Sequence, residues 1–331
     1  MAADGGTKAV VAALLANTGI AVLKFLAWLL TGASSMLAEA IHSVADAGNQ
    51  GLLLLGRKRA QRAATEEHPF GYGRERYVYA FIVAIVLFSV GGLFALYEAY
   101  HKWHQVHSGA PNELLESQWW WVPIAVLVGA IAMETFSFRT AIVEANRVRG
   151  ETGWVAFVRT AKSPELPVIL LEDLGALVGL ALALVGIGLS LLTGNAYWDV
   201  AGTAAIGVLL VAIAVILAIE TKSLLLGESA ARPAVRRIRE AIESVETVER
   251  IIHLKTLHLG PDELLVAAKI GVRPTESAAE VAAAIDAAEQ RIRAAEPPAR
   301  VIYLEPDIVR PTAGAPGELT QRPEPSAPAD R

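Results

Sequence analysis

Six apolar runs constrain the fold of this chain more than any other feature of the sequence. Each run is long enough to cross about 30 Å of hydrocarbon at about 1.5 Å of rise per helical residue. The runs cover roughly residues 9–30, 36–56, 77–100, 119–141, 166–191 and 198–221. The hydrophobic content of 53% is also too high for an ordinary soluble protein. We therefore expect an α-helical membrane protein built on a bundle of six transmembrane helices.

The distribution of lysine and arginine predicts how this bundle is oriented in the lipid bilayer. Positive residues are concentrated between the second and third runs and between the fourth and fifth runs, and the other connections carry almost none. Because positive residues favour cytoplasmic loops, we expect both termini in the cytoplasm. The high usage of Ala, Arg and Gly is typical of a bacterial chromosome rich in G and C, which favours the bacterial inner membrane.

The composition changes after Gly227 from apolar to mixed and charged, which indicates a domain boundary. Residues 1–227 form the predicted six-span domain. Residues 228–309 are expected to form a small cytoplasmic α+β domain of the ferredoxin-like αββαβ type. Its predicted elements are a helix at 232–245, strands at 249–259 and 262–273, a helix at 275–296 and a strand at 299–306. Residues 310–331 are rich in Pro, Gly and Ala and are predicted to be a disordered tail.

A polar stripe on the second run is the first candidate functional feature. At 100° per residue its members fall on one face of a helix; they are Glu39, His42, Ser43, Asp46, Asn49 and Gln50. Ionisable groups at bilayer depth are costly unless they are paired, so they usually mark an ion path. His42 and Asp46 lie one turn apart and have the chemistry to hold a divalent metal. The chain has no cysteine, which leaves His, Asp and Glu as metal ligands.

The fifth run carries a second polar cluster, Glu172 and Asp173. Counted from the cytoplasmic ends, Asp173 lies about 13 Å and Asp46 about 16 Å into the bilayer, so the two clusters are level. An imidazole and carboxylates from two helices suit Zn²⁺ and tolerate Co²⁺ or Mn²⁺. Adjacent residues point about 100° apart on a helix, so we expect Asp173 to ligate, with Glu172 or Glu39 competing for the fourth position. In the alternative interpretation, these groups only pair among themselves and link the helices.

Metal binding at such a site is expected to be coupled to protons. Only neutral imidazole and ionised carboxylate bind a metal, so protons and metal compete for the same lone pairs. Free histidine has a pKa of about 6.5, close to ambient pH. The residue types therefore predict exchange of metal for protons.

The same residues carry a family resemblance. The segments IHSVADAGNQ in the second run, HPFGYGRERY after a basic loop and LLED in the fifth run, with the αββαβ tail, resemble the cation diffusion facilitator family. They resemble in particular the branch that includes human zinc transporter nine. The resemblance implies a homodimer that exports a divalent cation, usually Zn²⁺, from the cytosol in exchange for protons. It also implies that His42 and Asp46 form one ligand pair and that Asp173 belongs to the other.

The sequence departs from the family pattern at Ile169, where the family usually places the partner of Asp173. Isoleucine cannot ligate a metal, so the candidates for the fourth ligand are Glu172, Glu39 and Glu134 of the fourth run. Secondary metal sites are considered at three further positions, which are His68 in the basic loop and Glu305 and Asp307 at the end of the last strand.

Other function classes fit the sequence less well. An intramembrane metalloenzyme needs a water-activating base beside a zinc motif such as HExxH, and the sequence contains none. There is no basic footprint for nucleic acid, and no prosthetic group is expected. The sequence therefore predicts a divalent cation exporter with Zn²⁺ as the favoured cargo. The alternatives are export of Mn²⁺, Co²⁺ or Fe²⁺ and a membrane metal sensor that does not transport.

Overall fold

The computed structural model describes residues 2–31, 34–109 and 119–309. Within the first two helices, the side chains of residues 2–9, 27–28, 30–31, 34–39 and 41–42 lie outside this description. The chain divides into two compact units. The first unit is Met1–Ala230 with Leu257–Leu264, and the second is Ala231–Thr256 with Leu265–Arg331. The predicted disordered tail, 310–331, lies outside the described residues.

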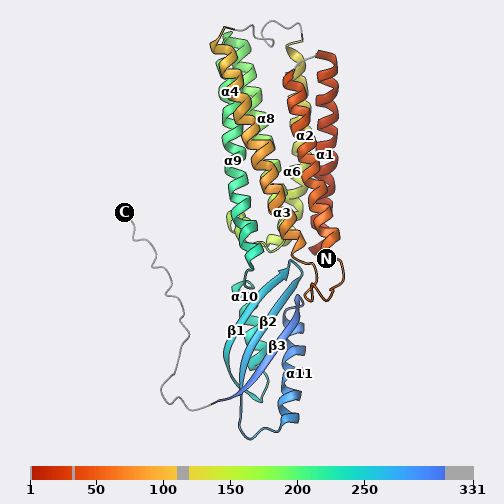
Figure 1. The fold of residues 1–331 in the computed structure, drawn as a ribbon, viewed down its shortest axis with the longest axis vertical. Helices are drawn as coiled ribbons and strands as arrows, with labels where there is room; N and C mark the ends of the chain where they lie inside the picture. The colour runs from red at the N-terminus through yellow and green to blue at the C-terminus, as the bar shows by residue number, and fades with distance from the viewer. Residues whose placement is uncertain (1, 32–33, 110–118, 310–331) are drawn as a thin grey trace, which may run out of the picture. The chain divides into compact units, whose positions relative to one another are not determined.

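The first unit is a bundle of long helices that run side by side (Figure 1). Its elements are α1 (Ala2–Thr31), α2 (Ser34–Ala60), α3 (Glu75–Val86), the π-helical segment η1 (Leu87–Leu93), α4 (Phe94–His107), α6 (Trp121–Arg149), the short α7 (Trp154–Thr160), α8 (Glu165–Thr193) and α9 (Tyr197–Leu226). Five of the six apolar runs each correspond to one of these helices, and the third run is spread over α3, η1 and α4. The prediction of a helical membrane domain is therefore confirmed.

Four helices in the described part of the chain are long and apolar enough to cross a membrane, namely Glu75–His107, Trp121–Arg149, Glu165–Thr193 and Tyr197–Leu226. The apolar part of α1 that can be assessed is shorter, Val10–Leu26. Helix α2 is less apolar because its polar stripe interrupts it, but Ser43, Asn49 and Gln50 of that stripe are buried. Six membrane crossings therefore remain a prediction.

Helices α8 and α9 approach each other closely at two glycines, where a residue with a side chain would not fit. A Cβ atom added to Gly186 would lie 3.0 Å from the carbonyl oxygen of Trp198, and one added to Gly202 would lie 3.1 Å from the carbonyl oxygen of Leu182. Small residues of this kind let the backbones of spanning helices pack against each other. The α8–α9 contact therefore depends on these two glycines.

The π-helical segment η1 was not predicted. It contains Gly91 and Gly92, both buried, and a Cβ atom added to Gly92 would come within 2.6 Å of the Val211 side chain on α9. Hydrophobic periodicity gives the third run as one continuous helix and does not distinguish a π segment within it. The segment lies where this helix packs against α9.

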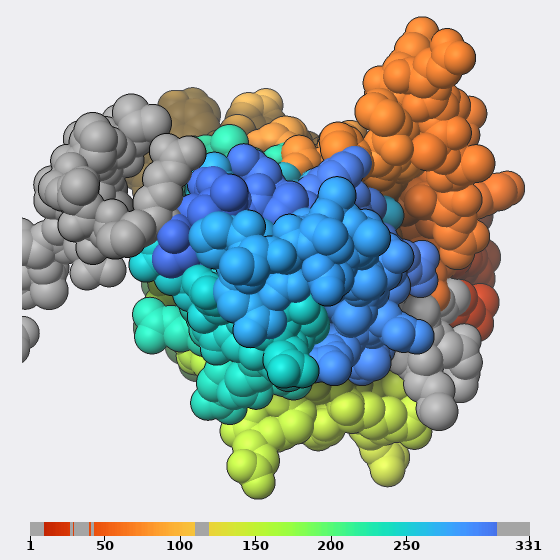
Figure 2. All heavy atoms as spheres, turned by 90° about the horizontal axis from the view of Figure 1, so that it is seen from below, coloured from red at the N-terminus to blue at the C-terminus, as the bar shows by residue number. Residues whose placement is uncertain are grey.

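The second unit has the predicted αββαβ order. Its elements are α10 (Arg232–Glu243), β1 (Val248–Gly260), β2 (Glu263–Val272), α11 (Ala278–Ala295) and β3 (Ala299–Ile308). The strands form one sheet in the order β1-β2-β3. Helices α10 and α11 lie against each other (Figure 2, teal and blue).

The core of this unit follows from simple periodicity. Val266, Ala268 and Ile270 alternate on β2 and are buried, as expected for one face of a strand. On α11, Ala288 and Ile292 are one turn apart and fully buried. The helix begins with a capping box, in which the Ser277 side chain accepts from the Glu280 backbone amide and the Glu280 carboxylate accepts from the Ser277 amide.

Candidate metal centre

Four carboxylates from three helices are buried together inside the first unit. They are Asp46 on α2, Glu134 on α6 and the adjacent Glu172 and Asp173 on α8, with exposed fractions of 9%, 3%, 4% and 1%. Each of them lies within electrostatic range of at least two others. We call this group the acidic cluster. So many acids buried inside a bundle of apolar helices need a cation, a proton or hydrogen-bond donors to compensate their charge.

Glu172 is held by amide groups of α2. The side-chain nitrogen of Asn49 donates to Oε1 of Glu172 at 3.0 Å, and that of Gln50 donates to Oε2 at 2.6 Å. Asn49 and Gln50 are almost wholly buried, so these hydrogen bonds are shielded from water. Both oxygens of Glu172 are therefore engaged, and the residue ties α8 to α2.

Asp173 points instead toward α6, as expected for the neighbour of Glu172 on a helix. Its Oδ2 atom accepts a hydrogen bond from the Ser137 hydroxyl at 2.8 Å. Its Oδ1 atom and Oε2 of Glu134 are buried and have no hydrogen-bond partner among the described residues. Buried polar atoms normally have a partner, so these two oxygens have lone pairs open to a cation, a proton or water.

The side chains of His42 and Glu39 lie outside the described residues, although both positions are on α2. Among the side chains that are described, no three His, Cys, Asp or Glu residues are close enough to hold a metal ion. Ile169 is fully buried in the apolar core and offers no ligand atom. Asp173 and Glu134 are thus the members of the cluster with an open oxygen.

Lys24 on α1 is a candidate that the sequence analysis missed. Its side chain is buried, at 4% exposure, and its Nζ atom donates to the Ser43 hydroxyl at 3.0 Å. Ser43 directly follows His42 on α2, and the charge of Lys24 lies within range of Glu134. The signal was present in the sequence, because Lys24 is the only charged residue within the first apolar run, 9–30.

The secondary candidates do not join the acidic cluster. His68 is exposed in the loop after α2, where its backbone amide donates to the Thr65 hydroxyl and its ring stacks on Tyr72 at 4.6 Å between centroids. Glu305 and Asp307 do lie together, but the ammonium of Lys269 is 3.1 Å from a carboxylate oxygen of each. These hydrogen bonds raise the pKa of Lys269. A cation at this pair of acids would have to displace the lysine.

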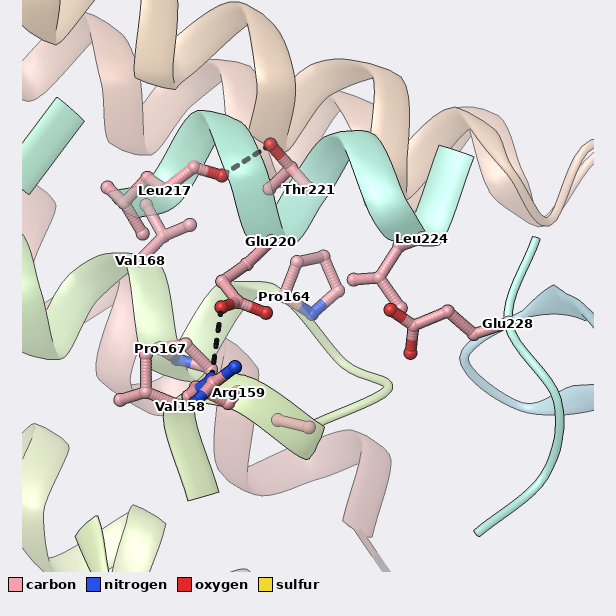
Figure 3. A pocket seen from close by; sticks show the side chains of 11 residues that line it. Val158, Arg159, Pro164, Pro167, Val168, Leu217, Glu220, Thr221, Leu224 and Glu228 are labelled. Atoms are coloured by element: carbon pink, nitrogen blue, oxygen red, sulfur yellow. Dashed lines mark hydrogen bonds and ion pairs between the residues drawn. The ribbon is translucent and has the colours of Figure 1, made fainter. Parts of the chain in front are cut away.

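A separate hollow lies at the ends of α7, α8 and α9 (Figure 3). Its walls are mainly apolar, and its two carboxylates are each paired, Glu220 with Arg159 at 3.8 Å and Glu228 with Lys162. Burial by itself would raise the pKa of Glu228, but hydrogen bonds from Lys162 and Ser223 lower it below the ordinary value. The hollow shares no residue with the acidic cluster, and we assign no metal to it.

Comparison with known families covers nearly the whole of the described chain. The family described as the cation efflux transmembrane domain matches residues 10–226. The family described as the cation efflux protein cytoplasmic domain matches residues 231–307. The acidic cluster lies within the first match, and the sheet lies within the second apart from its last residue, Ile308.

The chain is also similar to individual proteins along most of its length. The chain is 33% identical to the mouse proton-coupled zinc antiporter SLC30A9, mitochondrial, over 259 residues, which are 77% of this chain and 44% of the relative. It is 27% identical to metal tolerance protein C4 of Arabidopsis thaliana, over 80% of this chain and 56% of the relative. It is 25% identical to the magnetosome protein MamM of Magnetospirillum gryphiswaldense, over 83% and 80%. The chain thus spans about half the length of the first two of these relatives.

Proposed function

This chain belongs to the cation diffusion facilitator family of cation efflux transporters, and on that premise we propose that it exports Zn²⁺ from the cytosol in exchange for protons. It is an integral membrane protein. We place it in the bacterial inner membrane with both termini in the cytoplasm. We further propose a homodimer that is held together through the cytoplasmic domain, 231–307.

The acidic cluster is the observation that carries this proposal. Asp46, Glu134, Glu172 and Asp173 come from three helices of the transmembrane domain, and two of their buried oxygens have no hydrogen-bond partner among the described residues. Such an arrangement is costly in lipid unless a cation or protons use it. The mouse relative is a proton-coupled zinc antiporter, which supports zinc as the cargo.

We propose His42, Asp46 and Asp173 as three ligands of the transported ion. Glu134 is our choice for the fourth ligand, because its Oε2 atom is open whereas both oxygens of Glu172 already accept amide hydrogens. Asp46, Asp173 and Glu134 are not close enough together in the described arrangement to share one ion, so we propose that the helices bring these carboxylates together when the ion binds. Ligation by Glu172 would first require release of its two amide partners, and Glu39 remains an alternative on α2. An imidazole with three carboxylates is a donor set that suits Zn²⁺ in tetrahedral coordination.

Proton exchange follows from this donor set. A proton on a carboxylate or on the imidazole occupies the lone pair that the metal needs, so loading from a neutral cytosol releases protons and an acidic outer side expels the metal. Alternating access would arise from rocking of helices around a site near mid-depth. Because Asn49 and Gln50 of α2 donate hydrogen bonds to Glu172 of α8, we expect these two helices to move together.

The test is metal uptake into proteoliposomes that carry a pH gradient. We expect Zn²⁺ uptake by the wild type to collapse when the gradient is removed and to be lost in Asp173→Asn, which keeps the size of the side chain. Glu220→Gln is the matched control, because it removes a carboxylate from another spanning helix outside the acidic cluster. It should transport normally.

Zn²⁺, Mn²⁺, Co²⁺ and Fe²⁺ are compared in the same assay. If Mn²⁺, Co²⁺ or Fe²⁺ is taken up faster than Zn²⁺, that ion and not zinc is the cargo. Zinc binding without uptake of any metal would favour the sensor alternative. Equal uptake by the wild type and Asp173→Asn would contradict the proposed site.

A further inference from the structure

Lys24 is a buried basic residue that the ligand set does not use, although it lies beside that set. Its Nζ atom donates to the Ser43 hydroxyl at 3.0 Å, and Ser43 stands between His42 and Asp46 on α2. Its charge interacts with that of Glu134 on α6. The side chain therefore brings a positive charge from α1 to the region where α2 and α6 present the acidic cluster.

The direction of this side chain is informative. Lys24 is about 10 Å from the end of α1 at Thr31, measured along the helix. A lysine in a spanning helix usually extends its flexible chain toward the interface, where the ammonium is hydrated. Here the side chain is 4% exposed and packs against α2. The acids compensate the ammonium, and the ammonium compensates part of their charge.

We propose that Lys24 is a fixed counter-charge of the transport site that weakens binding of the divalent cation enough for the ion to be released. The inference rests on the proposed function and deepens it. The acidic cluster has four carboxylates, and Glu172 is stabilised mainly by the amides of Asn49 and Gln50. Without an ammonium nearby, the remaining acids would hold a divalent cation tightly. Lys24 is thus a positioning residue that acts through the charge of the site and not as a ligand.

The size of this effect follows from Coulomb's law. An ammonium and a divalent cation repel each other inside the protein, and at an effective dielectric constant of about 20 any separation up to roughly 20 Å gives a repulsion that changes a dissociation constant by on the order of tenfold or more. Removing the charge should therefore tighten metal binding. Because a tightly held ion leaves slowly, the same change should slow transport.

The experiment measures the Kd for Zn²⁺ of the full-length protein in lipid nanodiscs, together with zinc uptake into proteoliposomes. We expect Lys24→Gln and Lys24→Met to lower the Kd by about tenfold or more and to slow uptake. Lys24→Arg keeps the charge and should restore the wild-type Kd. Ser43→Ala removes the hydrogen-bond partner but keeps the ammonium, so its Kd should stay within about threefold of the wild type.

An unchanged or weaker affinity in Lys24→Gln would overturn the inference, and so would equal tightening in Ser43→Ala. If neither uncharged variant inserts into the membrane, Lys24 is needed for folding and the inference is also overturned. Failure of the proposed function gives a different result, in which Asp173→Asn binds Zn²⁺ as well as the wild type does. If Asp173→Asn loses binding and Lys24→Gln behaves as the wild type, only the role of Lys24 is wrong.

Discussion

Replacing Arg76 by methionine should destabilise the first unit by about 3–5 kcal/mol, because the change leaves the carboxylate of Glu165 buried without its cation. Arg76 lies in the first turn of α3 and Glu165 is the first residue of α8, and their side chains are only 10% and 6% exposed. The guanidinium donates to both carboxylate oxygens, with Nη2 at 2.9 Å from Oε2. Two-pronged pairs of this kind are the stronger class of ion pair.

The same guanidinium provides an internal control. Its Nη1 atom lies 2.8 Å from Oδ2 of Asp262, whose side chain is 57% exposed. Exposed pairs contribute about 0–1 kcal/mol, so Asp262→Asn should change the stability very little. The double variant Arg76→Met with Glu165→Leu removes both buried charges and should recover most of the lost stability.

Thermal unfolding of the purified protein in detergent, followed by tryptophan fluorescence, measures these differences. For a unit of this size, 1 kcal/mol corresponds to about 2–4 °C in Tm, so Arg76→Met should melt on the order of 10 °C below the wild type. Asp262→Asn should melt within about 3 °C of the wild type. If Arg76→Met and Asp262→Asn have the same small shift, or if the double variant is no more stable than Arg76→Met, our interpretation of this pair is wrong.

Three further predictions use the same unfolding assay. Gly186→Leu should lower the free energy of unfolding by about 1–3 kcal/mol, because the larger side chain forces α8 and α9 apart. Gly188→Leu is the control and should change the stability little, because a Cβ atom added to Gly188 meets no atom within 4 Å. Equal losses of stability in the two variants would contradict the close packing. Gln50→Leu should cost about 1–3 kcal/mol by leaving one oxygen of Glu172 without its donor, and a double change with Glu172→Leu should recover part of it. Because the folded pKa of Glu228 is lowered, its contribution should be complete above about pH 4.3, the pKa of an unfolded glutamate, and lost as pH falls through the folded pKa. The Tm difference between the wild type and Glu228→Gln should therefore be largest above about pH 4.3 and shrink as the pH falls below that value, and a difference independent of pH would refute this cause.

Much of the fold could be predicted from local pattern. The apolar runs fall on the helices of the first unit, and the change of composition near Gly227 lies close to the boundary of the second. Hydrophobic periodicity and composition suffice to predict the spanning helices, because each such helix satisfies its backbone hydrogen bonds within itself. The π segment Leu87–Leu93 was missed for the same reason, since an extra residue per turn leaves the apolar content unchanged.

The sequence by itself determined which residue types could carry chemistry, because a charge in an apolar run stands out wherever the helix packs. The sequence predicted that Asp46 and Asp173 lie at a similar distance from the cytoplasmic ends of their helices. It also showed that Lys24 is a charged residue in an apolar run, but it did not indicate which residue Lys24 contacts. Only the tertiary structure decided that Glu172 meets amides of α2, that Asp173 turns to α6 and that Lys24 reaches Ser43. Helical spacing fixes the face on which a side chain lies, but the neighbour on that face is set by how separate helices pack, and that information is not local to any stretch of the chain.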